Sequence, residues 1–89
     1  MATVNNKTKK RLIVKQGNEN IILPVTDIAL LYSESRTVFV IDQFSKKYLL
    51  QKSLSEVGKD LDEKIFFRAN RQVIINIHFL NKFYININN

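Results

Sequence analysis

The stretch of sequence that decides the fold is Phe66-Phe67-Arg68-Ala69-Asn70-Arg71-Gln72-Val73-Ile74-Ile75-Asn76. Two aromatic residues lead into a polar tip and a β-branched run leaves it, a pattern typical of two strands joined by a short loop. The apolar flanks are expected to be buried, with Val73 facing the core, so that the loop is held rigidly. Side chains of Arg match guanine edges and those of Asn or Gln match adenine edges, and rigid support places them accurately. This stretch therefore predicts that Asn70, Arg71 and Gln72 contact DNA.

The same stretch, followed by Ile77 and Leu80, resembles the signature of the LytTR-type DNA-binding domain, the output module of many bacterial response regulators. In the family's usual form, a His-Arg-Ser tip precedes aliphatic residues that end in Asn. Here Asn70 stands in place of the His and Gln72 in place of the Ser, while Arg71 and Asn76 match the family.

A second segment supports the resemblance. Leu23-Pro24-Val25-Thr26-Asp27-Ile28 is similar to the family's approach to its central hairpin, so the likeness extends over roughly Arg11 to Phe83. The fold it implies is an elongated stack of small antiparallel sheets with a short helix between them. The function it implies is sequence-specific binding of double-stranded DNA for bacterial transcription regulation. Complete members bind in pairs on direct repeats, under the control of an upstream regulatory domain that is not in this chain.

Composition agrees with a polyanionic partner. The chain has 89 residues, enough for one small domain, with a net charge of +6 and a pI near 9.8. Such a charge favours nucleic acid or an anionic membrane surface. No apolar run approaches the ~18 residues of a membrane span, and the N-terminus lacks the apolar core of a signal peptide. We therefore expect a cytoplasmic protein without membrane contact. The absence of Cys excludes disulfides and thiolate metal sites.

The pattern of apolar residues predicts a mostly β protein. Residues 1–10 are polar and basic and are interpreted as a flexible arm or linker, which leaves residues 11–89 as the domain. Ser53 and Glu56 form a capping-box pair that starts one short α-helix, about Leu54–Leu61. The expected strands are Leu12–Val14 and Ile21–Leu23, which flank a Gly-centred turn, then Ile28–Tyr32, Thr37–Ile41, Lys47–Gln51, the two strands around residues 66–76, and Phe83–Asn88, with a helical turn near His78–Asn81.

The end of the chain departs from the family pattern. Family members usually continue past the strand at Phe83–Asn88 into a further strand that carries a DNA-contacting basic residue, and this sequence stops at Asn89. We interpret the domain as lacking that final strand. An unpaired edge near Phe83–Asn88 would then be available for self-pairing with another chain, and DNA affinity would be weaker than in a complete member.

Two loops are the candidate DNA-binding sites. Arg71 occupies the family's contact position, with Asn70 and Gln72 assisting, although an ordinary solvated hairpin tip has a similar composition. Arg68 is expected to meet a phosphate or to pack on an aromatic ring. The resemblance also implies that the loop Ser35-Arg36-Thr37 enters a neighbouring groove, so that the two loops enter successive grooves of one duplex face.

Other classes of function find less support in the sequence. An enzyme needs a nucleophile with a base, a carboxylate pair, a metal cluster or a cofactor loop. The single His78 has no partner at ligand spacing, and the acidic residues near Asp60–Glu63 are bracketed by lysines, so we expect no catalysis, metal or cofactor. The alternative is a small β module that binds single-stranded nucleic acid or a protein partner through a sheet edge. The aromatic residues that could stack bases are instead expected in the core; they are Phe39, Phe44, Tyr48, Phe66 and Phe67.

Overall fold

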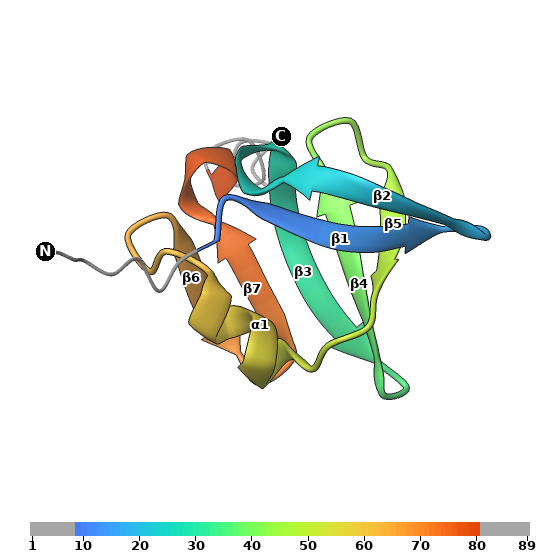
Figure 1. Cartoon of the computed structure of the whole chain (residues 1–89). Coiled ribbons are helices and arrows are strands. Elements are labelled where there is room, and N and C mark those ends of the chain that lie inside the picture. Colours follow the sequence, from blue (N-terminus) through green and yellow to red (C-terminus); the bar gives the residue numbers. More distant parts are fainter. Residues whose placement is uncertain (1–8, 81–89) are drawn as a thin grey trace, which may run out of the picture.

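The computed structural model of the protein describes residues 9–80. Most of that segment is antiparallel β-structure with one α-helix, which confirms the predicted fold class (Figure 1). The strands predicted within the segment are all present, with ends that differ by at most a few residues. The elements are β1 Arg11–Gln16, β2 Glu19–Pro24, η1 Val25–Asp27, β3 Ile28–Glu34, β4 Thr37–Asp42, β5 Lys47–Leu50, α1 Leu54–Asp60, β6 Phe66–Asn70, β7 Val73–Asn76 and η2 Ile77–Phe79, where η denotes a 3-10 helix.

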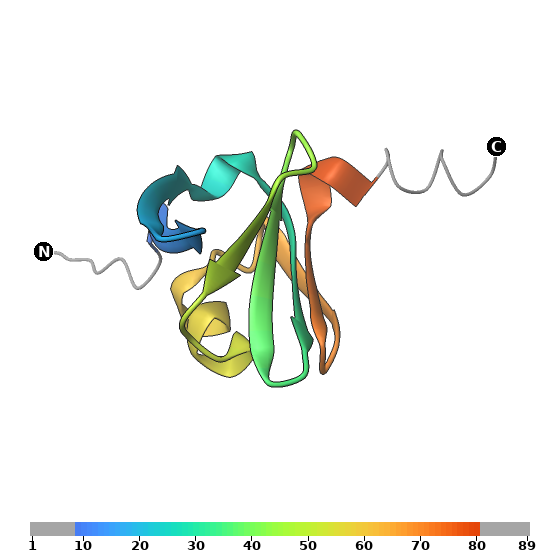
Figure 2. The same ribbon diagram turned by 90° about the vertical axis from the view of Figure 1, so that its right-hand side faces the viewer.

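The strands share one seven-stranded sheet in the order β2-β1-β5-β4-β3-β7-β6. The small sheets that were expected to stack are thus connected by hydrogen bonds into one continuous sheet. The join is narrow, because β1 and β5 are linked through the single register pair Lys15 and Leu49, whereas β1 and β2 pair over their full length. The β1–β2 hairpin is therefore free to turn away from the other five strands. Figure 2 shows it on the same side of β3, β4 and β7 as α1.

The hydrophobic core lies between the inner face of the sheet and α1. Alternate residues of β4 and β5 are buried, as expected for strands with one face packed and one face outward. Leu54 and Val57 of α1 and Leu61, which caps its C-terminal end, close the core from the helix side. The most deeply buried apolar side chains are those of Val14, Ile28, Leu31, Val40 and Val57.

The helix begins as predicted. The Ser53 hydroxyl accepts a hydrogen bond from the Glu56 amide at 3.1 Å, and the Glu56 carboxylate accepts one from the Ser53 amide at 3.0 Å. These two bonds satisfy amide groups that a helix end leaves without intrahelical partners. Gly58 lies where the helix meets β7, and a Cβ atom added there would lie 3.8 Å from Cδ1 of Ile74. That spacing is an ordinary contact, so no steric reason requires glycine at this position.

Several side chains expected in the core are not there. Ile74 is 3% exposed and faces the core, while Val73 is half-buried on the opposite face, so the expectation for Val73 is wrong by one residue. Phe66 is buried but its neighbour Phe67 is 48% exposed, because successive residues of a strand point to opposite faces. Phe44 is 74% exposed because it lies in the β4–β5 turn.

Tyr48 is buried, as expected, and its hydroxyl donates a hydrogen bond to the Asp42 carboxylate at 2.8 Å. The amides of Phe44 and Lys46 donate to the same carboxylate at 2.8 and 2.9 Å. Burial alone raises the pKa of Asp42, but the bonds from Lys46, Tyr48 and Phe44 outweigh it, and the pKa lies below its ordinary value of 3.8. Asp42 therefore holds the β4–β5 turn in its ionised form.

Asn76 is the other buried polar residue of the described segment. Its Nδ2 donates to the Ile28 carbonyl at 2.8 Å, and its Oδ1 accepts from the His78 amide at 2.8 Å. The side chain thus joins β7 to β3 and starts η2. Asn76, matched to the family by the resemblance, has a structural role here and lies away from the β6–β7 loop.

The predicted strand at Phe83–Asn88, its open edge and most of the N-terminal arm lie outside the described residues. Lys9, assigned to that arm, donates its amide to the Asp60 carbonyl at 2.7 Å. Lys52 and Lys9 place their ammonium groups 2.9 and 3.8 Å from the Asp60 carboxylate. Among residues 9–80, no helix is long and apolar enough to cross a membrane.

Candidate nucleic-acid interface

The structure brings the two predicted loops together at one end of the sheet. The β3–β4 turn consists of Ser35 and Arg36, and the β6–β7 turn consists of Arg71 and Gln72. Because β3 pairs with β7, the two turns are neighbours, and the Ser33 amide donates a hydrogen bond to the Gln72 carbonyl at 2.8 Å. Both turns lie at the lower end of Figure 2. Their centres are two strand spacings apart, about 10 Å.

The Ser35–Arg36 turn has an unusual backbone. Both residues have positive φ angles, 52° and 66°. This is the geometry of a type I′ hairpin turn, which suits the right-handed twist of the strands but favours Asn and Gly at these positions. The side chains of Ser35 and Arg36 are exposed, and the half-buried Thr37 hydroxyl lies 3.5 Å from the Ser35 carbonyl. Two residues that carry a Cβ atom thus occupy a conformation that costs each of them free energy.

The Arg71–Gln72 turn is held by the side chains that precede it. The Arg68 guanidinium donates from Nε to the Asn70 carbonyl at 3.2 Å and from Nη2 to the Arg71 carbonyl at 2.8 Å. The Asn70 carboxamide oxygen accepts from the Gln72 amide at 2.7 Å. Within residues 9–80, the side chains of Arg71 and Gln72 are exposed and make no internal hydrogen bond or ion pair. Their donors and acceptors are therefore available to a partner.

Two side chains of β6 bond to the backbone of this turn. The Arg68 guanidinium donates to the turn carbonyls, and its expected contact with a phosphate stays a prediction. Asn70 does not have a positive φ, and its side chain contributes to the turn by accepting a hydrogen bond from the Gln72 amide. Neither role was apparent from the sequence, since both depend on how the side chains fold back onto the loop.

The exposed outer face of the sheet carries an aromatic cluster. Phe39 was expected in the core but is half-buried on this outer face. Its ring stacks on that of Tyr32 across β3 and β4, with ring centroids 5.2 Å apart and an interplanar angle of 30°. The Lys47 ammonium lies 4.4 Å from the centroid of Phe39 and 5.8 Å from that of Tyr32. A platform for single-stranded bases needs open ring faces. In the Tyr32–Phe39 pair, the rings contact each other and a cation, so part of their face area is already occupied.

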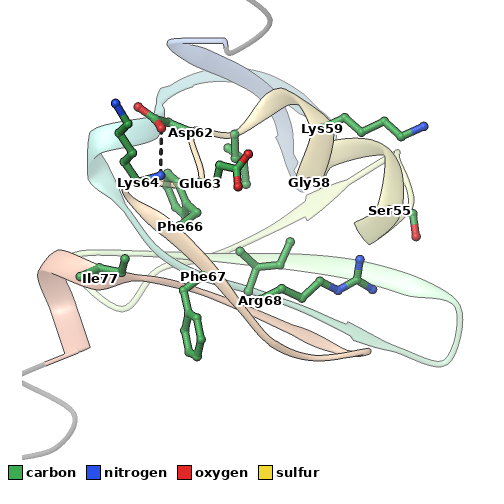
Figure 3. A pocket seen from close by; sticks show the side chains of 12 residues that line it. Ser55, Gly58, Lys59, Asp62, Glu63, Lys64, Phe66, Phe67, Arg68 and Ile77 are labelled. Atoms are coloured by element: carbon green, nitrogen blue, oxygen red, sulfur yellow. Dashed lines mark hydrogen bonds between the residues drawn. The ribbon is translucent and has the colours of Figure 1, made fainter.

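A groove between α1 and β6 has a volume of about 1050 Å³ (Figure 3). Apolar side chains line much of it, including Leu61, Phe66 and Ile74. Lys59 and Lys64 extend outward from its rim, and the Lys64 amide donates to the Asp62 carboxylate at 2.9 Å. No group of three or more His, Asp or Glu residues in the described segment is arranged to hold a metal ion.

Comparisons with known proteins give concordant results. The family model described as the LytTr DNA-binding domain matches residues 18–89. The transcriptional regulatory protein NatR of Bacillus subtilis is 32% identical over 73 residues, which are 82% of this chain and 31% of NatR, so the chain spans less than a third of that relative. The solved LytTr DNA-binding domain of a Bacillus cereus protein described as a methyl-accepting/DNA response regulator has a TM-score of 0.73 at 21% identity. It covers 79% of this chain and 63% of its own, and shows a common fold.

Proposed function

The chain belongs to the LytTR DNA-binding domain family, as the sequence resemblance predicted, and we propose that it recognises double-stranded DNA through the Ser35–Arg36 and Arg71–Gln72 turns to regulate transcription. The observation that carries this proposal is the hydrogen bond from the Ser33 amide to the Gln72 carbonyl, which fixes the two turns side by side while the Arg71 side chain stays free. The net charge of +6 adds a sequence-independent attraction to phosphates.

Each turn has a defined task in this proposal. Arg71 makes the bidentate contact to guanine O6 and N7 in the major groove, with Gln72 beside it to bond an adjacent base edge. Asn70 stabilises the turn by accepting a hydrogen bond from the Gln72 amide, and its own side-chain NH2 group is placed at the edge of the proposed interface. Arg36, flanked by the hydroxyls of Ser35 and Thr37, contacts phosphates or the neighbouring groove.

The spacing of the turns limits which grooves they enter. Successive major grooves on one face of a duplex are about 34 Å apart, whereas a major groove and the next minor groove are separated by half of that, about 17 Å. The centres of the two turns are about 10 Å apart. With the Arg36 and Arg71 side chains pointing away from each other, the turns span about 17 Å, but they do not span about 34 Å. The successive grooves in this proposal are therefore a major groove and its adjoining minor groove.

Regulation in this proposal involves more than one domain. Two copies bind direct repeats, with pairing controlled by an upstream regulatory domain outside this chain, as the family resemblance implies. NatR is named as a transcriptional regulatory protein, and it is longer than this chain. The domain acts on DNA in the bacterial cytoplasm. This role needs neither a catalytic group nor a cofactor.

Guanine methylation interference tests the proposed contact directly, because a methyl group on N7 blocks bidentate binding from the major groove. On a duplex selected for binding, we expect methylation of one guanine to abolish binding by the native protein and to leave the residual binding of Arg71→Ala unchanged. Lys59→Ala, which removes an exposed charge from α1 and not from either turn, should keep the native pattern. The same interference pattern for Arg71→Ala and the native protein would exclude Arg71 from base contact.

A further inference from the structure

We propose that Arg68 is a positioning residue for base recognition: its guanidinium fixes the backbone on which Arg71 stands and makes no DNA contact of its own. This inference rests on the proposed function, because positioning matters only if Arg71 contacts a base. It differs from the expected phosphate contact, and the two roles make opposite predictions for the same set of variants.

The contacts of Arg68 define this role. Two adjacent nitrogens of one planar group donate to the carbonyls of two consecutive residues, Asn70 at 3.2 Å and Arg71 at 2.8 Å. The guanidinium is rigid and its donors have a fixed fork geometry. Binding both carbonyls therefore fixes the orientation of the peptide groups on either side of the Arg71 Cα. A base-contacting side chain must start from a backbone held to a fraction of an ångström.

The local backbone explains why the turn needs this support. Two-residue hairpin loops favour primed turns with positive φ, because unprimed turns splay the strands. The neighbouring Ser35–Arg36 turn has positive φ at both positions, whereas Arg71 and Gln72 have none. The register between β6 and β7 also shifts between Arg68 and Asn70, which interrupts the ladder next to the turn.

The position of β6 adds to this need. Within residues 9–80 it is the last strand of the sheet and pairs only with β7, so no strand of that segment supports its outer side. The Ser33 bond to Gln72 stabilises the β7 side of the turn, and the Asn70 carboxamide holds the Gln72 amide. Arg68 is the contact that holds the β6 side, which includes the carbonyl of Arg71 itself.

Arg68→Lys separates the two roles, because Lys keeps the charge but cannot bind two carbonyls as a planar fork. We would measure the affinities of the native protein, Arg68→Ala, Arg68→Lys and Arg71→Ala for the selected duplex, for the duplex changed at the Arg71 base, and for a scrambled duplex, across a salt series. Lys59→Ala serves as the control for loss of one exposed charge.

For positioning, both Arg68 variants lose about tenfold or more on the selected duplex, the weight of one bidentate base contact. They also lose discrimination at the Arg71 base and keep the native salt slope. The double variant Arg68→Ala/Arg71→Ala should then bind no more weakly than Arg71→Ala alone. The proposal is overturned if Arg68→Lys binds like the native protein while Arg68→Ala loses equally on all duplexes, with its salt slope reduced by about 0.9, the signature of one phosphate contact.

A second measurement keeps this inference separate from the proposed function. In the DNA-free protein, the backbone amides of Arg71 and Gln72 should shift and become more mobile by NMR in both Arg68 variants, while amides of the buried strand β4 stay unchanged. Unchanged turn amides would refute the positioning role even if the protein binds DNA. A native protein that fails to distinguish the selected duplex from the scrambled one would refute base recognition, whatever the NMR result.

Discussion

Replacing Ser35 by Asn and Arg36 by Gly should stabilise the domain and weaken its binding to DNA. Both residues have positive φ angles, 52° and 66°, which cost a residue with a Cβ atom about 1–2 kcal/mol each. Arg36→Gly removes this cost but returns about 0.5–1 kcal/mol, because Gly loses more backbone entropy on folding. Ser35→Asn recovers a smaller part, because Asn tolerates the left-handed region better than most residues.

The net gain expected from the double variant is about 1 kcal/mol, which corresponds to a rise in Tm of about 4–8 °C for a domain of this size. Thermal unfolding followed by circular dichroism at pH 7 measures it, with urea unfolding as a second estimate of the free energy. Loss of Arg36 removes a cation from the proposed interface, so affinity for the selected duplex should fall in the same variant. A gain in stability with a loss of binding would show that the native residues of this turn favour binding at the expense of stability.

The matched control is Gln72→Gly in the neighbouring turn. Gln72 does not have a positive φ, so Gly removes no strain there and should lower the free energy of unfolding by about 0.5–1 kcal/mol. An unchanged or lower Tm for Ser35→Asn/Arg36→Gly would contradict the reasoning, because the turn would then store no strain. Equal effects of Gly at both turns would contradict it as well.

Three further predictions concern stability. Asp42→Asn should lower the free energy of unfolding by about 1–3 kcal/mol at pH 7, because it weakens a buried acceptor of three hydrogen bonds. Since the native pKa of Asp42 lies below 3.8, its contribution to stability is present above pH 3.8 and is lost as the pH falls through that lower pKa. Urea unfolding between pH 2 and 7 should therefore show that the free energy of unfolding falls less at the acid end for Asp42→Asn than for the native protein. Ile74→Asp should unfold the domain by circular dichroism, at a cost of roughly 3–5 kcal/mol, while Val73→Asp on the outer face should stay folded; the reverse order would show the register of β7 to be wrong. Gly58→Ala should raise the free energy of unfolding by about 0.5–1 kcal/mol. A lower free energy of unfolding would show that the added methyl group clashes with its neighbours, of which Cδ1 of Ile74 lies 3.8 Å away.

The sequence predicted the elements well because their signals are local. Alternating apolar residues, the Gly-centred first turn and the capping box of Ser53 and Glu56 depend only on nearby residues, and all are present in the structure. The family followed from the residues around Arg71, and the family match confirms it. Register was less predictable, since three consecutive β-branched residues, Val73 to Ile75, fit the core equally well by composition. The structure places Ile74 inward.

The sequence suggested which residues form the candidate site but not the geometry in which the fold places them. The candidate loops are 35 residues apart in sequence, and only the pairing of β3 with β7 places them side by side. The bonds from Arg68 and Asn70 to the turn depend on a register shift that no sequence pattern indicates. The exposure of Phe67 and Phe44 likewise follows from the strand face and the turn to which each belongs. Whether these turns contact DNA stays a prediction.

Selection of bound duplexes from a random pool at near-physiological salt, with Arg71→Ala in parallel, tests the central claim most directly. The native protein should recover a sequence motif, and Arg71→Ala should lose the preference at one position, with a cost of about 1–3 kcal/mol on the selected duplex. Recovery without any motif, at a Kd of about 10⁻⁴–10⁻⁶ M, would contradict the claim, because the charge of +6 alone would then account for the binding.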